Sequence, residues 1–586
     1  MIFSKAQHKM RLVSFVALLA TATLVAGDGL DWWKTALIYQ IYPRSFKDSD
    51  GDGIGDLNGI KSKLPYLKDL GVDAIWMSPI FLSPMYDFGY DITDYRQIAP
   101  EYGTMADFEA LLAEAKKIGV RVIQDYVPNH TSNESEWFVK STKRDPQYEN
   151  YYVWADGVRG ADGLIGPPSN WISIFRNSAW EYSPTRGQYY LHQFLIGQPD
   201  LNYREPKVQK EMKDVVRFWL DKGVSGFRVD AINVMYEVDP KNFGGKYPDE
   251  PLSGGTDPQD YEYLKHPYTK DLDETYNVVY DWRDILDEYI EKQGEYKFMV
   301  TEAYTDLDLM MKYYGNGQRN GSIPFNFVFL GDIKNQSNAR EIKLVIDKWM
   351  TFMPSGKVAN WVNGNHDQSR LASRLGTDRV DIMNMLALLL PGVTCTYQGE
   401  EIAMTDGYVS WQDTKDPQAC NTNDPINYWK KSRDPNRTPF HWDDSKNAGF
   451  STGNSTWLPV ADNYKTLNVA AQMNSKKSHY QFYKDVAALK KTKAVREGDL
   501  DTRTFSQSIL VLTRLAPGTP GVVGIVNLSD KDETVDLSSL KLLPPQLRVA
   551  ASGVDCKLET GTTVNKNSIQ VSAHCAIALQ SVSNCC

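Results

Sequence analysis

Seven polar residues that could act together in catalysis follow four separate apolar runs of the chain. They are Asn129 and His130, Arg228 and Asp230, Glu302, and His366 and Asp367. Cleavage of a glycosidic bond needs one carboxylate at the anomeric carbon and a second carboxyl group that protonates the leaving oxygen. Any one of these acids alone would more often make a structural ion pair near a loop. Their recurrence after four apolar runs favours a shared catalytic site.

Arg228 stands two residues before Asp230 in a run that reads as a strand. Alternate residues of a strand point to the same side, so the two side chains should lie together. A neighbouring guanidinium favours the ionised carboxylate, and we therefore expect Asp230 to be charged at neutral pH.

The elements that must position these residues alternate between helix and strand. Three amphipathic helical patterns, each closed by a glycine (Gly71, Gly119 and Gly223), lead into the apolar runs DAIWMSPI, VRVIQDYV and GFRVDA. Five further runs bring the candidate strands to eight: ALIYQIY, KFMVTEA, IPFNFVF, VANWVNG and GVTCTYQG. Apolar strands separated by helices predict a parallel sheet, and this length favours a closed (β/α)8 TIM barrel whose strand ends meet on one face.

Two segments interrupt or end this alternation. The stretch 130–202 is rich in Trp, Tyr and Pro, and we read it as a domain inserted after the third strand. From 497 to 586 the pattern becomes short alternating strands, typical of a C-terminal antiparallel β-sandwich domain. The barrel is then predicted to comprise 28–129 and 203–496.

The composition excludes several classes of function. The formal net charge of -10, without a basic cluster, argues against a nucleic-acid-binding surface. Three basic residues before the apolar run VSFVALLATATLVAG predict a cleavable signal peptide over 1–27, rather than an uncleaved anchor, because the run is too short to span a bilayer. We therefore expect a secreted, extracellular protein without a membrane span.

Export makes disulfides and glycans plausible. The cysteine spacing suggests Cys395 with Cys420 and Cys556 with Cys575, although connectivity does not follow from sequence, and Cys585 and Cys586 remain for each other or for a partner chain. Candidate N-glycan acceptors are Asn133, Asn320, Asn335, Asn454 and Asn527. Asn129 also begins an acceptor motif, but it lies beside His130, and we predict that it is unmodified.

The blocks around these residues resemble a known family. QDYVPNH, GFRVDAIN, TEAYT and WVNGNHD are similar to the signature regions of the α-amylase family of glycoside hydrolases. QPDLN resembles the oligo-1,6-glucosidase and α-glucosidase branch, and SRDPNRTPFHWDDS and YQIYPRSFKDSDGDGIGDL look like insect maltases, including mosquito enzymes. The resemblance implies a secreted exo-acting α-glucosidase that cleaves maltose, sucrose and short oligosaccharides with retention of configuration.

The same resemblance implies roles for individual residues. Asp230 would be the nucleophile, Glu302 the general acid and base, and Asp367 the transition-state stabiliser. His130 and His366 would help to recognise the glucosyl ring. Asp87, Tyr90 and Arg437 would close the pocket around the terminal glucose, with Asp87 and Arg437 as an ion pair, and Phe175, Phe194 and Gln198 would wall the entrance. Taken alone, the aromatic residues would more often be core.

The acidic stretch DSDGDGIGD indicates a cation site. Asp48, Asp50 and Asp52 match the first ligand positions of a helix–loop–helix calcium site, with a backbone carbonyl from Ile54. The twelfth position is Gly59 instead of a bidentate Glu, so a calcium sensor is not expected, and Asp56 is the remaining candidate. We predict a fixed structural calcium or magnesium ion over an unoccupied turn, as the resemblance also implies, and no organic cofactor.

Other functions remain open at this stage. A glycosyl-enzyme intermediate can be intercepted by a sugar, which would give transglycosylation or sucrose isomerisation. The family also includes catalytically dead transporter subunits and maltases that serve as toxin receptors, so a binding protein is the alternative from another class. Ala231, which follows Asp230, matches neither residue expected for α-1,4 or α-1,6 selectivity.

Overall fold

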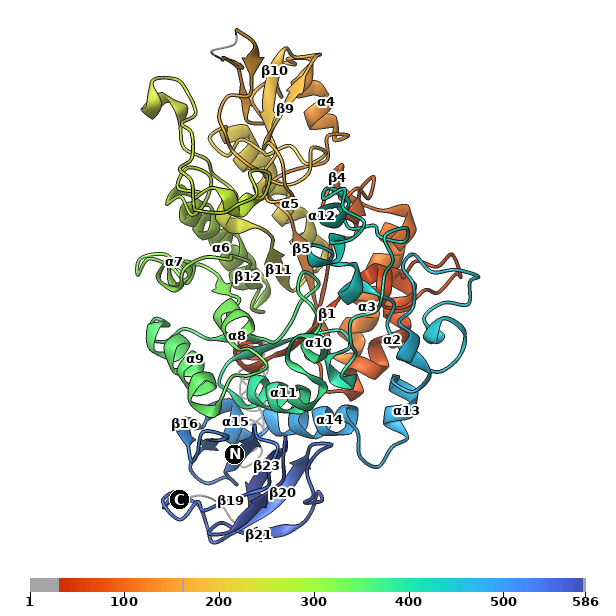
Figure 1. The fold of residues 1–586 in the computed structure, drawn as a ribbon, viewed down its shortest axis with the longest axis vertical. Coiled ribbons are helices and arrows are strands. Elements are labelled where there is room, and N and C mark those ends of the chain that lie inside the picture. Colours follow the sequence, from red (N-terminus) through yellow and green to blue (C-terminus); the bar gives the residue numbers. More distant parts are fainter. Residues whose placement is uncertain (1–30, 161–162, 583–586) are drawn as a thin grey trace, which may run out of the picture.

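The computed structural model describes residues 31–160 and 163–582. The predicted signal peptide and the Cys585 and Cys586 pair lie outside the described residues. Three layers follow one another along the long axis of the molecule (Figure 1): a segment carrying β9 and β10 at the top, a barrel in the middle and a C-terminal sheet at the bottom.

Eight parallel strands form the barrel, as predicted from the sequence. They are β1 (Leu37–Ile41), β2 (Ala74–Met77), β5 (Arg121–Tyr126), β11 (Gly226–Val229), β12 (Phe298–Thr301), β13 (Ile323–Pro324), β14 (Asn360–Val362) and β15 (Val393–Tyr397). They neighbour one another in the order β13-β12-β11-β5-β2-β1-β15-β14. A parallel bridge between Asn326 and Trp361 links the two ends and closes the barrel.

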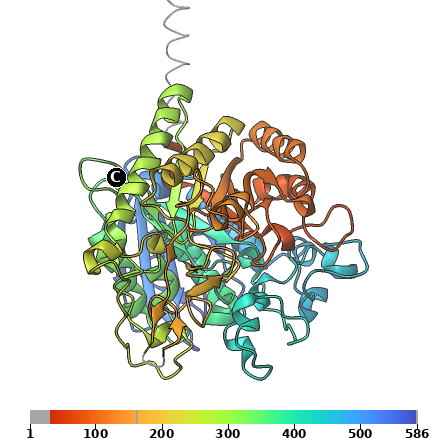
Figure 2. The ribbon, with the colours of Figure 1, turned by 90° about the horizontal axis from the view of Figure 1, so that it is seen from above.

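Helices pack around the barrel and produce its outer ring, which is visible from above (Figure 2). The main ones are α2 (Leu57–Asp69), α3 (Met105–Ile118), α5 (Pro206–Lys222), α6 (Glu274–Gln293), α9 (Ala339–Phe352), α11 (Val380–Leu389) and α14 (His479–Lys490). Gly119 and Gly223 end α3 and α5 in the left-handed conformation, with φ of 71° and 102°. This conformation costs glycine least, so the predicted helix ends are confirmed there.

One predicted strand is divided between a short strand and the start of a helix. In IPFNFVF only Ile323–Pro324 is strand, whereas Phe327–Asp332 forms helix α8. The side chain of Asn326 accepts a hydrogen bond from the Phe329 N–H and so caps the helix. An apolar run of this length does not distinguish a buried strand from a buried helix, and the asparagine cap decides between them.

Two segments depart from the alternation of strands and helices. After β5, the strands β6 (Trp154–Ala155), β9 (Trp180–Ser183) and β10 (Gln188–Leu191) form a three-stranded antiparallel sheet. Between β15 and α14, residues 398–478 form mainly short helical turns and loops, a second excursion that the sequence patterns did not indicate. Both excursions contribute residues to the site described below: Phe175 and Phe194 come from the first, and Gln418 and Arg433 from the second.

The C-terminal region is antiparallel, as expected. Its six-stranded sheet comprises β16 (Asp499–Thr504), β17 (Ile509–Leu515), β18 (Val522–Asn527), β20 (Gln546–Ser552), β21 (Thr563–Asn565) and β23 (Ala576–Ser581). These strands neighbour one another in the order β16-β17-β18-β23-β20-β21. A two-stranded sheet of β19 (Glu533–Val535) and β22 (Ile569–Val571) completes it. Leu510 and Leu512 of β17 belong to the same buried apolar cluster as the barrel, so the two regions share a core.

The cysteine predictions have different outcomes. Cys556 and Cys575 form a disulfide, as predicted. Cys395 and Cys420 are both free, so the pairing suggested for them is wrong. Cys395 is buried in strand β15, whereas Cys420 is exposed at the end of helix α12 (Pro417–Cys420). The two side chains therefore lie in different environments, although they are close in sequence.

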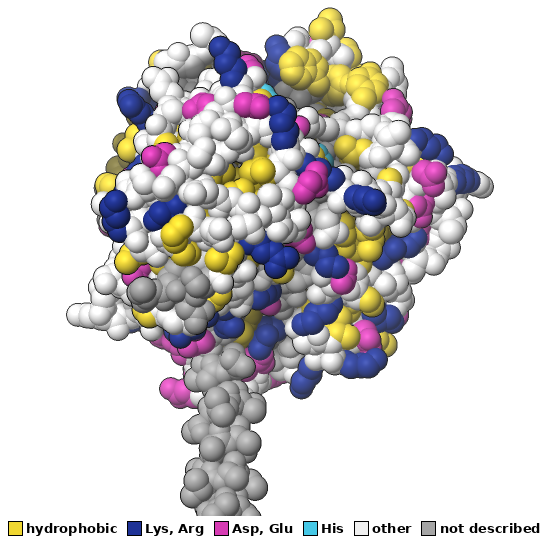
Figure 3. All heavy atoms as spheres, turned by 90° about the horizontal axis from the view of Figure 1, so that it is seen from below, with side chains coloured by type: hydrophobic (Ala, Val, Ile, Leu, Met, Phe, Trp, Pro, Cys, Tyr) yellow, Lys and Arg dark blue, Asp and Glu magenta, His cyan; other side chains and the backbone are white. Residues whose placement is uncertain are grey.

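Charged side chains of both signs lie together on one face of the molecule. On the face seen from below, Lys and Arg are interspersed with Asp, Glu and apolar side chains (Figure 3). Among the described residues, no helix combines the length and the apolar character that crossing a membrane requires.

The predicted glycan acceptors differ in exposure. Asn320, Asn335 and Asn454 are exposed, and Asn133 is half-buried. Asn527 is buried, and its Nδ2 donates to the carbonyls of three residues, Lys531, Val571 and Ser572. A glycan on Asn527 would break these bonds, so the structure contradicts that acceptor, whereas the exposed asparagines stay predictions.

Candidate active site

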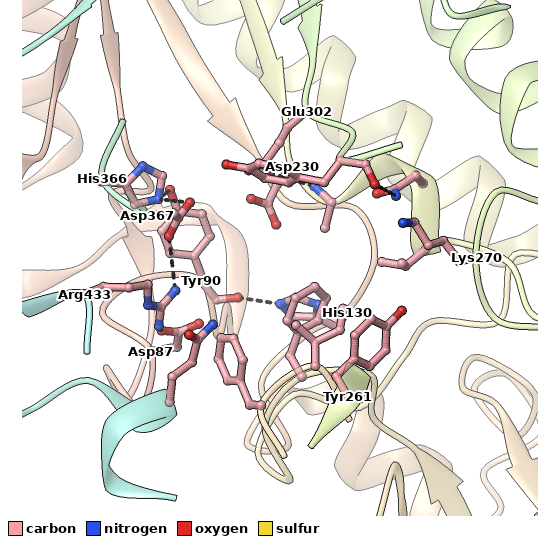
Figure 4. A pocket seen from close by; sticks show the side chains of 18 of the residues that line it. Asp87, Tyr90, His130, Asp230, Tyr261, Lys270, Glu302, His366, Asp367 and Arg433 are labelled. Carbon is pink, nitrogen blue, oxygen red and sulfur yellow. Dashed lines mark hydrogen bonds and ion pairs between the residues drawn. The ribbon is translucent and has the colours of Figure 1, made fainter. Parts of the chain in front are cut away.

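The predicted catalytic residues converge in one cavity at the ends of the barrel strands. The cavity encloses about 420 Å³. Asp230 directly follows β11, Glu302 directly follows β12, and Asp367 lies in the loop after β14. Figure 4 shows the three carboxylates facing this space, with His130 and Tyr261 on the opposite wall.

Arg228 holds three carboxylates at the inner end of the cavity. Its Nη1 lies 2.6 Å from Asp230 Oδ1 and 3.0 Å from Asp125 Oδ1, and its Nη2 lies 2.6 Å from Glu302 Oε2. All four side chains are buried. One guanidinium therefore orients both the proposed nucleophile and the proposed acid, and Arg228 lies beside Asp230 as its spacing predicted.

Burial dominates the protonation of these acids. It raises the pKa of Glu302 to about 8, with the charges of Asp230 and Asp367 adding to burial and Arg228 opposing it. It also raises the pKa of Asp230 to about 6, again against Arg228. Since Glu302 holds its proton more firmly than Asp230, the pair suits an acid and a nucleophile at neutral pH.

The backbone after Asp230 is strained at Ala231, and the N–H of Ala231 contacts Glu302. Ala231 has φ of 46°, a left-handed conformation that residues other than glycine rarely adopt. Its N–H donates to Glu302 Oε2 at 3.2 Å. The turn thereby links the ends of β11 and β12, and strain of this kind is typical of functional sites.

Asp87 and an arginine form an ion pair at the other end of the cavity. Arg433 Nη2 lies 2.9 Å from Asp87 Oδ1 and 2.7 Å from Asp416 Oδ1, and its Nη1 lies 3.2 Å from Asp367 Oδ1. The sequence interpretation assigned this partnership to Arg437, and that assignment is wrong. Arg437 instead donates to the His366 carbonyl at 2.8 Å and to Asp367 Oδ1 at 2.9 Å.

Asp367 is the most acidic of the three proposed catalytic groups. Burial alone would raise its pKa, but the neighbouring His366, Arg433 and Arg437 outweigh burial and hold the pKa well below its ordinary value. His366 Nε2 lies 3.3 Å from Asp367 Oδ2 and 2.6 Å from the Tyr90 hydroxyl. Asp367 is therefore a fixed anion, unlike Glu302.

The remaining predicted residues form the wall beside Asp87. Gln198 Nε2 donates to Asp87 Oδ2 at 3.3 Å and lies 3.2 Å from His130 Nε2. His130 Nε2 also lies 3.0 Å from the Tyr90 carbonyl oxygen (Figure 4). Burial lowers the pKa of His130 to about 4, so its imidazole is neutral at physiological pH. Phe194 packs against His130 and Phe175, with ring centroids 5.1 and 5.5 Å apart.

Sequence reasoning missed several residues of the site. They are Asp125, Tyr261, Lys270, Tyr304, Gln418 and Arg433. Asp125 and Arg433 stand inside motifs that were recognised, QDYVPNH and SRDPNRTP, so a closer comparison of those motifs could have found them. Tyr261 and Gln418 lie in helices of a single turn, and Lys270 lies in a loop, so no periodicity marks these residues as facing the cavity.

The acidic loop at 48–56 gathers three of its predicted ligands. The side-chain oxygens of Asp48, Asp50 and Asp56 lie within 4.8 Å of one another. Asp52 does not belong to this group; its Oδ1 accepts instead from the Ile54 N–H at 2.7 Å. Three converging carboxylates without a bound cation repel one another, and oxygen ligands of this kind fit calcium or magnesium.

The same loop rules out the helix–loop–helix arrangement. Asp56 caps the start of α2, where its Oδ1 accepts from the Gly59 N–H at 2.7 Å. A Cβ on Gly59 would lie 1.9 Å from the Lys47 carbonyl oxygen. No side chain, and therefore no bidentate glutamate, fits at the twelfth position.

Comparison with known proteins adds an independent finding. The model of the α-amylase catalytic domain matches residues 40–498. The chain is 49% identical over 559 residues to Maltase A1 of Drosophila melanogaster, covering 94% of this chain and 96% of the relative. It is 47% identical over 555 residues to the salivary α-glucosidase of Anopheles gambiae, covering 94% and 93%.

Solved structures agree with these relatives. The α-glucosyl transfer enzyme XgtA has a TM-score of 0.80 at 34% identity, covering 94% of this chain and 99% of the other. Fold, sequence and the arrangement of carboxylates point the same way. The chain is a glycoside hydrolase that belongs to the α-amylase family.

Proposed function

We propose that this protein is a secreted, exo-acting α-glucosidase that releases terminal α-1,4-linked glucose from maltose, sucrose and short oligosaccharides. The relatives support an α-glucosidase function in general, since they are named maltases and α-glucosidases. The observation that carries the finer proposal is the contact of Asp230 and Glu302 with the single guanidinium of Arg228, in a cavity that ends at the Asp87–Arg433 ion pair.

The reaction would proceed in two displacements. Asp230 attacks the anomeric carbon while Glu302 gives its proton to the glycosidic oxygen, so that a glycosyl ester forms and the aglycone leaves. Glu302 then takes a proton from water, and the oxygen of that water attacks the anomeric carbon and releases Asp230. Two inversions give net retention, and the raised pKa of Glu302 suits its role as the acid of the first step.

Exo-action follows from the closed end of the cavity. Asp87, Asp367 and Arg433 fill the space beyond the site of bond cleavage with fixed charges that can bind sugar hydroxyls. A polysaccharide chain could not continue past them, so only a chain end would reach Asp230. The neutral His130 and the aromatic rings of Phe175 and Phe194 would then line the terminal glucose.

Two accompanying features belong to the proposal. The salivary origin named for the mosquito relative supports export, in agreement with the signal peptide expected from the sequence. Asp48, Asp50 and Asp56 would hold a calcium or magnesium ion that stabilises the loop between β1 and α2. The ion would be structural and would take no part in the reaction.

Glucose release from maltose, sucrose and isomaltose by the purified chain tests the proposal. Asp230→Asn and Glu302→Gln serve as matched variants, because each keeps the shape of the side chain and removes its ability to ionise. We expect glucose from maltose and sucrose, with kcat lower by about three orders of magnitude or more in both variants.

The alternatives give different products in the same experiment. Larger oligosaccharides or isomers of sucrose in place of glucose would indicate transglycosylation or isomerisation on the same carboxylates. A folded wild type that releases no glucose and forms no new glycoside would contradict the enzyme proposal and favour a binding protein.

A further inference from the structure

The turn that carries Phe175 into the cavity has two residues in a strained conformation. Arg176 and Asn177 have φ of 81° and 67°, in the left-handed region. Two consecutive residues other than glycine persist there only where the surroundings hold them. Strain of this kind recurs at ligand-binding sites, and the contacts of Arg176 show what holds it here.

The side chain of Arg176 ties this turn to a separate loop. Its Nη1 donates to Asp260 Oδ1 at 2.5 Å, and its Nη2 donates to Asp257 Oδ2 at 2.7 Å and to Gln259 Oε1 at 3.1 Å. The backbone repeats the link, since the Asn177 N–H donates to the Gln259 carbonyl at 2.9 Å. The turn lies in the excursion after β5, whereas Asp257 and Asp260 follow β11, so the bonds join distant parts of the chain.

Each end of the link continues directly into the wall of the cavity. Phe175 precedes Arg176 and lines the cavity. Tyr261, labelled in Figure 4, follows Asp260 and lines the cavity as well. The guanidinium of Arg433, which pairs with Asp87 and Asp367, lies 4.9 Å from the centre of the Phe175 ring. A shift of Arg176 would therefore move two walls and disturb the arginine at the closed end.

A third segment joins at the same place. The side chain of Asn421 donates to the Phe175 carbonyl at 2.9 Å. Lys431 Nζ lies 3.6 Å from Asp260 Oδ1 and 3.7 Å from Glu262 Oε2. Both residues come from the excursion after β15, so three loops from different strands meet around Arg176 and Asp260.

Arg319 provides a control that distinguishes a role of Arg176 at the site from a general contribution of an arginine to stability. Arg319 also pairs with two aspartates, Asp281 at 2.7 Å and Asp284 at 2.5 Å. It does not line the cavity. Isolated ion pairs at the surface contribute little to stability, so a difference between the two arginines would come from what each one positions.

We propose that Arg176 is a positioning residue that sets the affinity for the terminal sugar by holding Phe175 and Tyr261 in place in the wall of the cavity. The inference rests on the proposed α-glucosidase function, because affinity is read from that substrate. Arg176 does not take part in bond cleavage, so its loss should weaken binding much more than it slows the chemical step.

The test compares Arg176→Ala, Arg176→Lys and Arg319→Ala with wild type on maltose. We expect Arg176→Ala to raise KM by about tenfold with kcat changed by less than about threefold, because misplaced walls weaken contacts to the substrate. Arg176→Lys should restore part of the affinity, and Arg319→Ala should leave KM unchanged. An unchanged KM in a folded Arg176→Ala variant, or an equal rise in Arg319→Ala, overturns the proposal.

Hydrogen–deuterium exchange gives a readout that does not depend on activity. Arg176→Ala should speed exchange in 172–178 and 257–262, while Arg319→Ala should not. If Arg176→Ala does not fold, the isosteric Asp260→Asn removes one partner from the opposite loop and should produce the same changes. If the wild type releases no glucose, only the proposed function is contradicted. The exchange experiment then tests the role of Arg176 by itself: unchanged exchange in 172–178 and 257–262 of the Arg176→Ala variant overturns it.

Discussion

Two buried groups of charges at opposite ends of the cavity differ in their ratio of arginines to carboxylates. At the inner end, Arg228 serves Asp125, Asp230 and Glu302. At the closed end, Arg433 and Arg437 together serve the carboxylates of Asp87, Asp367 and Asp416. Every member of the two groups is buried except Asp367, which is half-buried, so burial alone does not distinguish them.

The protonation of the two groups differs accordingly. With one guanidinium for three acids, burial prevails, and the pKa values of Asp125, Asp230 and Glu302 are all raised. With two guanidiniums, the pKa values of Asp367 and Asp416 are lowered despite burial, although burial still raises that of Asp87. The placement of arginines thus favours the ionised form of Asp367 and Asp416 at one end of the cavity, while Glu302 at the other end can hold a proton.

Removal of Arg228 should have the largest effect. Arg228→Met leaves three buried carboxylates without a cation, which costs about 3–5 kcal/mol of folding free energy. It also raises the pKa of Asp230 further, so less nucleophile is ionised at neutral pH. We expect kcat/KM on maltose to fall by about three orders of magnitude, measured on protein whose fold is checked by circular dichroism.

The acid limb of the pH profile provides the control for that variant. If the Arg228→Met variant keeps measurable activity, its acid limb should lie at higher pH than that of wild type, because the pKa of Asp230 is raised. Residual activity with an unshifted limb would show that Arg228 does not control the ionisation of Asp230.

Removal of Arg433 should have a smaller effect of a different kind. Arg433→Met takes away one of two arginines, so Asp367 keeps Arg437 as a partner. We expect kcat/KM to fall by about a hundredfold, mainly through KM, because contacts to the terminal sugar are lost. Arg433→Lys keeps the charge but loses the planar fork, and it should recover only part of the affinity. A fall confined to kcat would contradict the assignment of Arg433 to binding.

The pH dependence of wild type tests the inner group directly. Asp230 must be ionised, so kcat/KM should rise with pH through its pKa of about 6. Glu302 must carry a proton, so kcat/KM should fall as pH rises through its pKa of about 8. Because the carboxyl groups of Asp230 and Glu302 interact, the two limbs of the profile give apparent pKa values of the pair and not of either residue alone. A profile without an alkaline limb would remove Glu302 from the role of acid.

The smallest effect is expected at a third group of carboxylates, Asp48, Asp50 and Asp56, where a metal ion instead of an arginine would supply the positive charge. Within the described residues, no arginine forms an ion pair with Asp48, Asp50 or Asp56. Chelation by EDTA should lower Tm by about 2–5 °C, and calcium should restore it. Asp50→Asn should abolish the response to calcium, while an identical response in wild type and variant would contradict the proposed ion.

Local patterns were sufficient to predict much of the fold. Helical spacing closed by Gly119 and Gly223, followed by apolar runs, identified the repeating units of the barrel. The pattern failed in IPFNFVF, where the cap at Asn326 starts helix α8 within the apolar run. It also failed between β15 and α14, since a long excursion without periodicity carries no local signal.

The sequence identified the site only in part. Asp230, Glu302 and Asp367 stand immediately after predicted strands or in recognised motifs, and the structure brings them together in one cavity. The partner of Asp87 could not be chosen from SRDPNRTP, which offers two arginines four residues apart. Cys395 and Cys420 show the same limit, because their short separation in sequence did not place them side by side.

The sequence by itself determined where most strands form, which polar residues stand at their ends and which family the chain resembles, because these depend on local spacing and on contiguous motifs. The tertiary structure decided which charges share a partner: Arg433 with Asp87, Arg228 with Glu302, and Arg176 with Asp260. The physical reason is that pKa values and ion pairs depend on distances of a few ångströms between segments distant in sequence, and only the closed barrel with its two excursions fixes those distances.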